Sequence, residues 1–347
     1  MREKGEEHTA VNDYYFIDGC FISHYINISS WRFSMRRRHR HHSRHIHLLL
    51  LIPVMALLIS GIAAIFLYSC SPFPENHGDV SLTPNPPQQI TGIHSRQAIL
   101  TLPENNAPLA VKAPDERIYP ASMTKLMSAL VAVSQIEDLN VEIEMTETAY
   151  QAMLAEGASM SGFLPGERAS VRNFLCGCLL PSGGDCCICL AEYVSGSEDK
   201  FVAIMNRKAE ILGMTETHFT NTTGLHDDAH YSTVRDISIL LQAVLQNPEL
   251  YDILTSKTHV VPPTNRHPEG FTMHSTMFQY LAGSDLSSGH ILGGKTGYTS
   301  IAGQCLASFA SVNGSLYILV TAGAFPPSAE EHWNTEDALD IYSRYSK

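Results

Sequence analysis

The spacing of apolar residues divides residues 90–347 into strand-like, helix-like, strand-like and helix-like stretches, in that order. Two short apolar runs at 98–102 and 107–111, on either side of Glu104-Asn105-Asn106, predict a hairpin. Apolar residues spaced three and four apart then predict helices at 122–136, 147–155, 171–180, 185–195, 198–212 and 234–246. Strand-like runs and one last helix follow at 259–262, 291–298, 304–311, 316–323 and 328–345.

Turn signals separate several of these predicted elements. Asn313-Gly314, between the last two strand-like runs, is a strong signal for a two-residue hairpin. Asn247-Pro248 predicts the end of a helix, because a proline excludes the residue before it from the helical region. The order of the elements predicts an α+β fold, in which a mainly antiparallel sheet is flanked by helices and carries a helical insert.

An uncharged, mainly apolar run of 21 residues, Leu48–Tyr68, is long enough to span a bilayer. The Arg- and His-rich run at 35–44 precedes it and is expected to keep that flank in the cytoplasm. The chain beyond the span should then lie outside the membrane. We therefore predict a cytoplasmic basic segment, a transmembrane anchor or signal, a Pro-rich linker and a folded domain at 1–47, 48–70, 71–89 and 90–347.

Two features of the N-terminal region leave alternatives open. Met35 is an alternative start, because residues 35–70 alone make a compact signal or anchor. Leu67-Tyr68-Ser69-Cys70 resembles a bacterial lipoprotein cleavage box, in which Tyr68 is a poor fit. We favour an uncleaved anchor, whereas a lipidated Cys70 would replace the spanning helix by an acyl anchor.

The charge distribution argues against a nucleic acid partner. Residues 1–47 contain eight of the 23 Lys and Arg residues and five of the 35 Asp and Glu residues. Residues 48–70 contain neither kind, so the rest of the chain carries 15 basic and 30 acidic side chains. A domain with this excess of negative charge repels phosphates, and we expect no nucleic acid to bind.

Five of the eight cysteines lie close together, at Cys176, Cys178, Cys186, Cys187 and Cys189. Tetrahedral metal sites usually place C-x-x-C pairs in loops, whereas these cysteines fall in two apolar, helix-like stretches. We expect them to pack in the core as small hydrophobic side chains. A disulfide bond outside the cell is the alternative.

Ser122 and Lys125 stand three residues apart near the start of a predicted helix, so their side chains share one face. A serine nucleophile needs a neighbouring base, and a neutral lysine can serve as one. Burial and a second cation nearby would each lower the pKa of such a lysine. The spacing alone is weak evidence, because Ser197-Glu198-Asp199-Lys200 repeats it at what is expected to be an exposed helix start.

Lys295-Thr296-Gly297 ends the apolar and glycine-containing run that begins at Ile291. Glycines in a strand allow another backbone to approach, so a substrate strand could pair there while Lys295 and Thr296 hold an anion. Gly289–Thr296 also matches the phosphate-binding loop G-x-x-x-x-G-K-[ST], which needs a helix directly after it. A strand-like run follows instead, and we favour the strand over a nucleotide site.

Three blocks within residues 93–325 resemble those of the D-alanyl-D-alanine carboxypeptidases, the low-molecular-weight penicillin-binding proteins. The S-x-x-K, S-x-N and K-T-G signature of that family corresponds here to Tyr119–Lys125, Leu179–Asp185 and Gly293–Thr299. Connecting segments at 212–214, 219–225 and 230–233 are similar to those of the family as well. The resemblance implies the transpeptidase fold of penicillin-binding proteins and serine β-lactamases, with residues 90–347 as a serine DD-peptidase catalytic domain.

The resemblance implies a role for each block. Ser122 attacks the peptide bond between two D-alanines, Lys125 accepts its proton, and Ser182 relays a proton to the leaving amine. The implied substrate-binding residues are Lys295, Thr296, Gly297, Tyr298 and Gly184. The backbone N–H groups of Ser122 and Tyr298 are implied to form the oxyanion hole. The implied substrate is a peptidoglycan stem peptide ending in D-Ala-D-Ala, β-lactams are implied covalent inhibitors, and no metal or cofactor is needed.

Gly184 departs from the family, which usually has an asparagine in this position. An asparagine would bind the substrate amide and help to order the lysine. We therefore expect a backbone group, water or Asp185 to replace it, or activity to be reduced. Two alternatives remain open: a DD-endopeptidase of the same fold, and a non-catalytic wall-binding or β-lactam-sensing protein.

Two further expectations concern a metal site and the membrane. His226-Asp227-Asp228-Ala229-His230 raises a metal site as an alternative, which its loop position disfavours because metal-binding histidines four residues apart share a helix face. Many relatives carry a C-terminal β-rich domain and an amphipathic anchor. Here we expect the N-terminal helix to attach the chain to the cell membrane, with the catalytic domain outside the cytoplasm.

Overall fold

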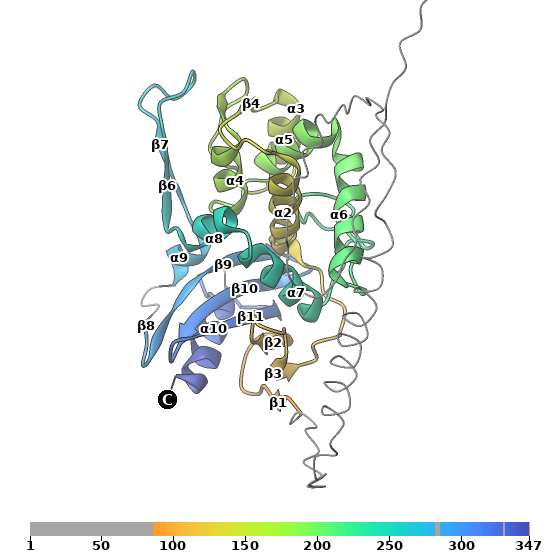
Figure 1. Ribbon diagram of the computed structural model, residues 1–347, viewed down its shortest axis with the longest axis vertical. Helices are drawn as coiled ribbons and strands as arrows, with labels where there is room; N and C mark the ends of the chain where they lie inside the picture. The colour runs from red at the N-terminus through yellow and green to blue at the C-terminus, as the bar shows by residue number, and fades with distance from the viewer. Residues whose placement is uncertain (1–85, 282–284, 329, 347) are drawn as a thin grey trace, which may run out of the picture. The chain divides into compact units, whose positions relative to one another are not determined.

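The computed structural model describes residues 86–281, 285–328 and 330–346 (Figure 1). The predicted cytoplasmic segment, the predicted membrane span and most of the predicted linker lie outside these residues. Among the helices of the described part, none combines the length and the apolar character that crossing a membrane requires.

The main sheet has seven strands in the order β1-β3-β2-β11-β10-β9-β8. Every pair is antiparallel except β1 with β3, which is parallel. The strands are β1 (Gln88–Gln89), β2 (Gln97–Thr101), β3 (Pro108–Lys112), β8 (Asp285–Leu286), β9 (Gly289–Thr299), β10 (Gly303–Val312) and β11 (Ser315–Ala324). The pairing of β2 with β11 therefore joins the strands from the start of the domain to its last strand.

Both faces of this sheet are covered by other elements. Successive side chains of a strand point to opposite sides, so neighbouring residues of one strand pack into different cores. In β2, Ile99 belongs to the large core shared with the helical part of the chain. Its neighbour Leu100 belongs to a smaller core with Tyr342 of the last helix, α10 (Trp333–Tyr345). Figure 1 shows α10 on one side of the sheet and the helical part on the other.

The helical part begins with a 3-10 turn, η1 (Ala121–Thr124), and α2 (Lys125–Gln135). Several of its helices start where a Ser, Thr or Asn side chain accepts a hydrogen bond from a free backbone N–H group, as Ser170 does from Asn173. The other helices are α3 (Glu147–Ala155), α4 (Val171–Leu179), α5 (Gly184–Ser195), α6 (Glu198–Leu212), α7 (Val234–Leu245), α8 (Pro248–Thr255) and α9 (Thr276–Tyr280).

The predicted α+β fold class is confirmed, and the long elements lie close to their predicted bounds. The hairpin at Asn313-Gly314 is also confirmed, because both residues have positive φ and join β10 to β11. The phosphate-loop alternative is wrong: Gly289–Thr299 is one continuous strand, and the next element is the strand β10. The last helix starts at Trp333, five residues later than predicted.

Short elements were missed. The Asn247-Pro248 signal for a helix end is also the start of α8, where Asn247 accepts from the N–H groups of Glu249 and Leu250 and proline takes the first helical position. Two small two-stranded sheets, of three or four residues per strand, were incompletely predicted because such strands show little periodicity. They are formed by β4 (Glu142–Glu144) with β5 (Arg168–Ser170), and by β6 (Thr258–Val261) with β7 (Phe271–His274).

Candidate active site

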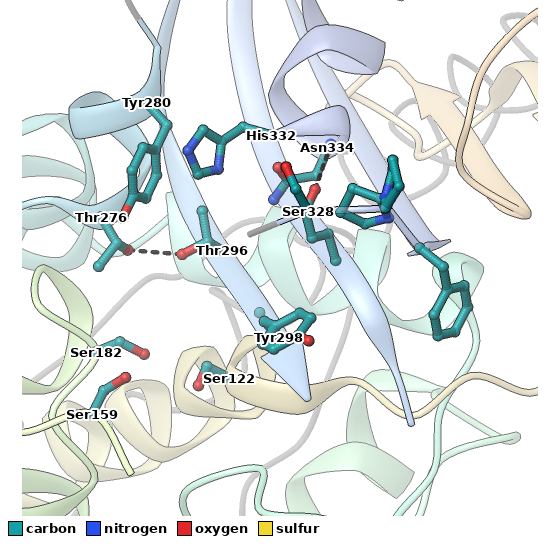
Figure 2. Close-up of a pocket in the computed structure, with 15 residues that line it drawn as sticks. Ser122, Ser159, Ser182, Thr276, Tyr280, Thr296, Tyr298, Ser328, His332 and Asn334 are labelled. Carbon is teal, nitrogen blue, oxygen red and sulfur yellow. Dashed lines mark hydrogen bonds between the residues drawn. The ribbon is translucent and has the colours of Figure 1, made fainter. Parts of the chain in front are cut away.

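A cavity of about 550 Å³ lies where η1, the loop before α5 and the strand β9 meet. Figure 2 shows Ser122, Ser159 and Ser182 along one wall and Thr296 and Tyr298 along the other. Tyr280, His332 and Asn334 line its far end. The structure thus brings together five of the residues selected from the sequence: Ser122, Ser182, Thr296, Gly297 and Tyr298.

Lys125 lies beneath Ser122 and is almost completely buried. Its Nζ is 2.8 Å from Ser122 Oγ and donates to the backbone oxygen of Thr223 at 2.7 Å. Burial lowers the pKa of Lys125, while the nearby thiols of Cys187 and Cys178 act in the opposite direction. The environment therefore favours a neutral amine directly below the serine hydroxyl.

A second buried pair spans the two walls: Lys295, from β9, contacts Ser182, from the loop before α5. Its Nζ donates to Ser182 Oγ at 2.8 Å and to the backbone oxygen of Thr296 at 2.9 Å. Burial, followed by the positive charge of Lys125, lowers the pKa of Lys295 to about 7. Two lysines that cannot both be charged at low cost thus face the two serines.

The backbone around both serines is tightly constrained. Ala121 and Ser182 have φ values of 45° and 67°, in the left-handed region that side-chain-bearing residues rarely adopt. Gly224 has φ 80°, and a Cβ atom there would lie 1.9 Å from the backbone oxygen of Ala121. Close approach of this glycine therefore fixes the turn that presents Ser122. Strain of this kind persists only where the surrounding structure determines it.

The strand β9 has a free edge beside the cavity. Among the described residues, β8 pairs only with Gly289 and His290, while the rest of β9 pairs with β10 alone. Thr296, Gly297 and Tyr298 lie along this open part, and Tyr298 is 65% exposed. Thr296 Oγ1 is 2.7 Å from Thr276 Oγ1, which fixes its hydroxyl toward the cavity wall (Figure 2). An extended peptide could pair with such an edge.

Comparisons with known proteins identify the family of the chain. The family model described as D-alanyl-D-alanine carboxypeptidase, peptidase family S11, matches residues 82–326. The chain belongs to this family. It is 31% identical over 256 residues to the D-alanyl-D-alanine carboxypeptidase DacF of Bacillus subtilis. The aligned region covers 72% of this chain and 63% of DacF. The chain therefore spans less than two thirds of the length of this relative.

Solved structures agree with the fold. The crystal structure of the D-alanyl-D-alanine carboxypeptidase from Mycobacterium tuberculosis is similar with a TM-score of 0.63 and 26% identity, over 75% of this chain and 94% of that one. The Streptomyces K15 DD-transpeptidase is similar with a TM-score of 0.65 and 24% identity, over 73% of this chain and 98% of that one. The latter similarity supports the fold alone.

Gly184, the departure from the family signature, lies behind the cavity wall. It begins α5, and its N–H donates to the backbone oxygen of Ser159 at 2.9 Å. A Cβ atom at Gly184 would lie 2.5 Å from the sulfur of Met153. Asp185 is buried and accepts from the N–H and hydroxyl of Ser161, so its carboxylate is occupied away from the serines. Ser159, missed by the sequence analysis, lines the cavity beside Ser182.

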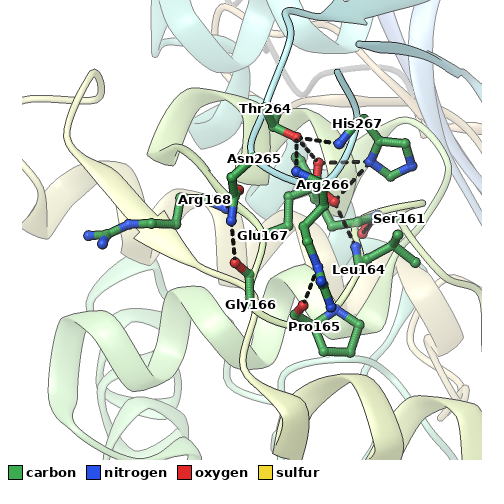
Figure 3. A network of polar contacts seen from close by, with 11 residues as sticks. Ser161, Leu164, Pro165, Gly166, Glu167, Arg168, Thr264, Asn265, Arg266 and His267 are labelled. Carbon is green, nitrogen blue, oxygen red and sulfur yellow. Dashed lines mark hydrogen bonds and ion pairs between the residues drawn. The ribbon is translucent and has the colours of Figure 1, made fainter. Parts of the chain in front are cut away.

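The loop that carries Ser159 is held by the hairpin of β6 and β7 (Figure 3). Glu167 is fully buried and accepts hydrogen bonds from the Thr264 hydroxyl, at 2.6 Å, and from His267 Nδ1, at 2.8 Å. Asn265 donates to the backbone oxygen of Gly166 in the same region. No local signal in the sequence joins these two segments, because they are about 100 residues apart.

His230 supports the nucleophile turn from behind. Its Nδ1 accepts from the Thr220 N–H at 3.1 Å, so the proton on Nε2 can be donated to Thr124 Oγ1 at 2.8 Å. Burial lowers the pKa of His230 to about 4, which keeps the ring neutral. Both nitrogens are thereby occupied. Within the described residues, no three His, Cys, Asp or Glu side chains are grouped as metal ligands.

Restoring the family's asparagine at Gly184 is expected to destabilise this chain. The new side chain would overlap the buried Met153, and such overpacking typically costs about 1–3 kcal/mol of unfolding free energy. Adding Met153→Ala to Gly184→Asn should recover part of this loss by opening the space. Urea unfolding of the wild type, both single variants and the double variant measures the coupling. Strictly additive effects of the two substitutions would contradict the packing argument.

Proposed function

We propose that the chain is an extracytoplasmic serine-type D-Ala-D-Ala carboxypeptidase that removes the terminal D-alanine from peptidoglycan stem peptides. The observation that carries the proposal is the buried Lys125 amine 2.8 Å from Ser122 Oγ, at a cavity that also holds the Ser182–Lys295 pair. Family membership and the order of the three blocks support the same activity.

In the first step, neutral Lys125 accepts the proton of Ser122 as its Oγ attacks the carbonyl carbon between the two D-alanines. The backbone N–H groups of Ser122 and Tyr298 stabilise the oxyanion, and donors of this kind typically contribute about 3–4 kcal/mol each. The proton taken up by Lys125 is passed through Ser182 to the nitrogen of the leaving D-alanine, so that Lys125 is neutral again and Ser182 keeps its hydroxyl. The product of this step is an acyl ester on Ser122.

The terminal carboxylate of the substrate binds to Lys295 and Thr296 at the open edge of β9. Thr276 orients the Thr296 hydroxyl by the hydrogen bond between their side chains. After D-alanine leaves, water enters beside the ester and Lys125 accepts its proton. Hydrolysis then releases the shortened peptide and restores Ser122.

Two measurements on the full-length chain test the proposal. A blocked peptide ending in D-Ala-D-Ala should release D-alanine, detected with D-amino-acid oxidase. A tagged penicillin should attach to the tryptic peptide Ile118–Lys125, with fragmentation placing the adduct on Ser122. A folded protein that releases no D-alanine and takes up no penicillin would contradict the proposal.

The same assays separate the two alternatives. A β-lactam sensor would carry the adduct on Ser122 without releasing D-alanine, and a wall-binding protein would carry none. A DD-endopeptidase would cleave cross-linked muropeptides faster than uncrosslinked ones of the same stem. The carboxypeptidase proposal requires the opposite preference.

We also propose that residues 48–70 anchor the chain in the cell membrane, with the catalytic domain outside the cytoplasm. The apolar run and the preceding basic residues support this topology. The full-length chain should sediment with membranes, resist extraction by alkaline carbonate and dissolve in detergent. Protease added to spheroplasts should digest the catalytic domain, and its protection there would contradict the topology.

The rate should fall as the pH rises through about 7. Lys295, whose pKa is lowered to about 7, then loses the charge that holds the substrate carboxylate. The kcat/KM for a D-Ala-D-Ala peptide measured from pH 6 to 9 checks this descending limb, and a flat profile would contradict it. The stability of the fold should change in the opposite direction and rise with pH. The unfolded chain binds this proton more tightly, so the charged Lys295 destabilises the folded protein fully below pH 7, and this destabilisation disappears as the pH rises toward 10.5.

A further inference from the structure

We propose that Cys178 and Cys187 form a disulfide bond that ties α4 to α5 across the loop bearing Ser182. Their sulfur atoms are 2.8 Å apart, and both side chains are completely buried. A covalent S–S bond is about 2.05 Å long, so a further approach of less than about 1 Å closes it. The helices already pack against each other and hold the two side chains in place.

The other cysteines of the group have different neighbours. The sulfur of Cys186 faces Gly177, and the sulfur of Cys189 lies 3.4 Å from the Thr146 N–H nitrogen and 3.7 Å from the Met145 sulfur. Among the described residues, Cys178 and Cys187 are the two cysteines whose sulfur atoms are in direct contact with each other. The expected core packing of the group is confirmed by its burial, and the bridge distinguishes one pair within it.

The position of this pair connects it to the catalytic residues. The bridge would enclose the turn in which Ser182 adopts φ 67°. The Cys178 sulfur also lies 4.0 Å from the backbone oxygen of Lys125, at the start of α2. A covalent link here fixes the Ser182 turn relative to Lys125. The covalent bond, in addition to packing, then helps to hold the Ser182 backbone in its strained conformation.

The inference rests on the proposed location outside the cytoplasm, because disulfide bonds persist in oxidising compartments. The oxidant is a disulfide, R–S–S–R, of a small thiol or of a thiol–disulfide oxidoreductase. One cysteine thiolate attacks it to give a mixed disulfide and one R–SH, and the second thiolate then displaces the other R–SH. The two cysteines lose two protons and two electrons, and the oxidant gains them.

The bond must form while the chain is folding. Burial raises the pKa of the Cys187 thiol well above its ordinary value, so the folded protein offers little thiolate and no access for an oxidant. The same burial protects the bond from reduction once it has formed.

Mass analysis of the full-length chain from cell membranes tests the bond without any activity assay. Proteins are quenched in acid, denatured and alkylated with iodoacetamide, and trypsin then yields Asn173–Lys200 with all five cysteines of the group. We expect three alkylated cysteines and the loss of two hydrogen atoms. Cleavage before Asp185 should leave the two halves joined through Cys178 and Cys187. Five alkylated cysteines, or a bond between another pair, would overturn the proposal.

Thermal unfolding gives an independent test. Heating exposes the buried bond to dithiothreitol as the chain unfolds, so scans slow enough for reduction should give a wild-type Tm lower by roughly 5 °C or more, as expected for opening a short disulfide loop in a domain of this size. It should leave the Tm of the Cys178→Ala/Cys187→Ala variant unchanged. The Cys176→Ala/Cys189→Ala variant, a matched control with two other buried thiols removed, should keep the response to reductant. A wild-type Tm that does not respond to reductant would overturn the proposal even if D-alanine release is observed.

Discussion

Replacing Lys125 with alanine is expected to reduce both D-alanine release and penicillin acylation by about 1,000-fold or more, because the base beside the nucleophile is lost. The buried amine is 2.8 Å from Ser122 Oγ. Burial lowers the pKa of Lys125, which favours the neutral amine that can accept a proton. Single-turnover acylation by a tagged penicillin measures this step directly.

The chain offers a matched control for this substitution. Ser197 and Lys200 repeat the S-x-x-K spacing, but Ser197 caps α6 and Lys200 is exposed. Lys200→Ala should therefore leave the acylation rate within about twofold of wild type, as for most surface substitutions. Lys125→Met keeps most of the buried volume and separates loss of the base from loss of packing. An acylation rate near wild type in Lys125→Met would show that another group serves as the base.

Replacing Gly224 with alanine is expected to cost several kcal/mol of unfolding free energy. The left-handed conformation alone costs a side-chain-bearing residue about 1–2 kcal/mol. In addition, the new Cβ atom would lie 1.9 Å from the backbone oxygen of Ala121, which cannot move without displacing Ser122. The variant should also be acylated more slowly, because the nucleophile turn must shift. Urea unfolding and the acylation rate measure the two effects.

Gly213 separates conformation from collision. It has φ 78°, close to the 80° of Gly224, but a Cβ atom there would meet nothing within 4 Å. Gly213→Ala should therefore show only the conformational cost of about 1–2 kcal/mol and a normal acylation rate. Equal stabilities for the two alanine variants would refute the role assigned to the Gly224 contact.

Elements with strong local signals were predictable from the sequence. The caps of α4 and α6 and the hairpin at Asn313-Gly314 depend on residues within a few positions of one another. The pairing of Ser122 with Lys125 is of the same kind, since the two residues are three positions apart in one helical turn. The short strands β4 and β7 were missed because three or four residues are too few to show a periodic pattern.

The sequence by itself determined the order of the blocks, the α+β class and the local pairing of serine with lysine. Only the tertiary structure decided that Lys295 reaches Ser182 across 113 residues, and that Thr223 supplies an oxygen to Lys125 across 98. It also decided that Met153 fills the space beside Gly184. Local propensities act over a few residues, whereas these contacts depend on how the helical part and the sheet pack, which no short segment encodes.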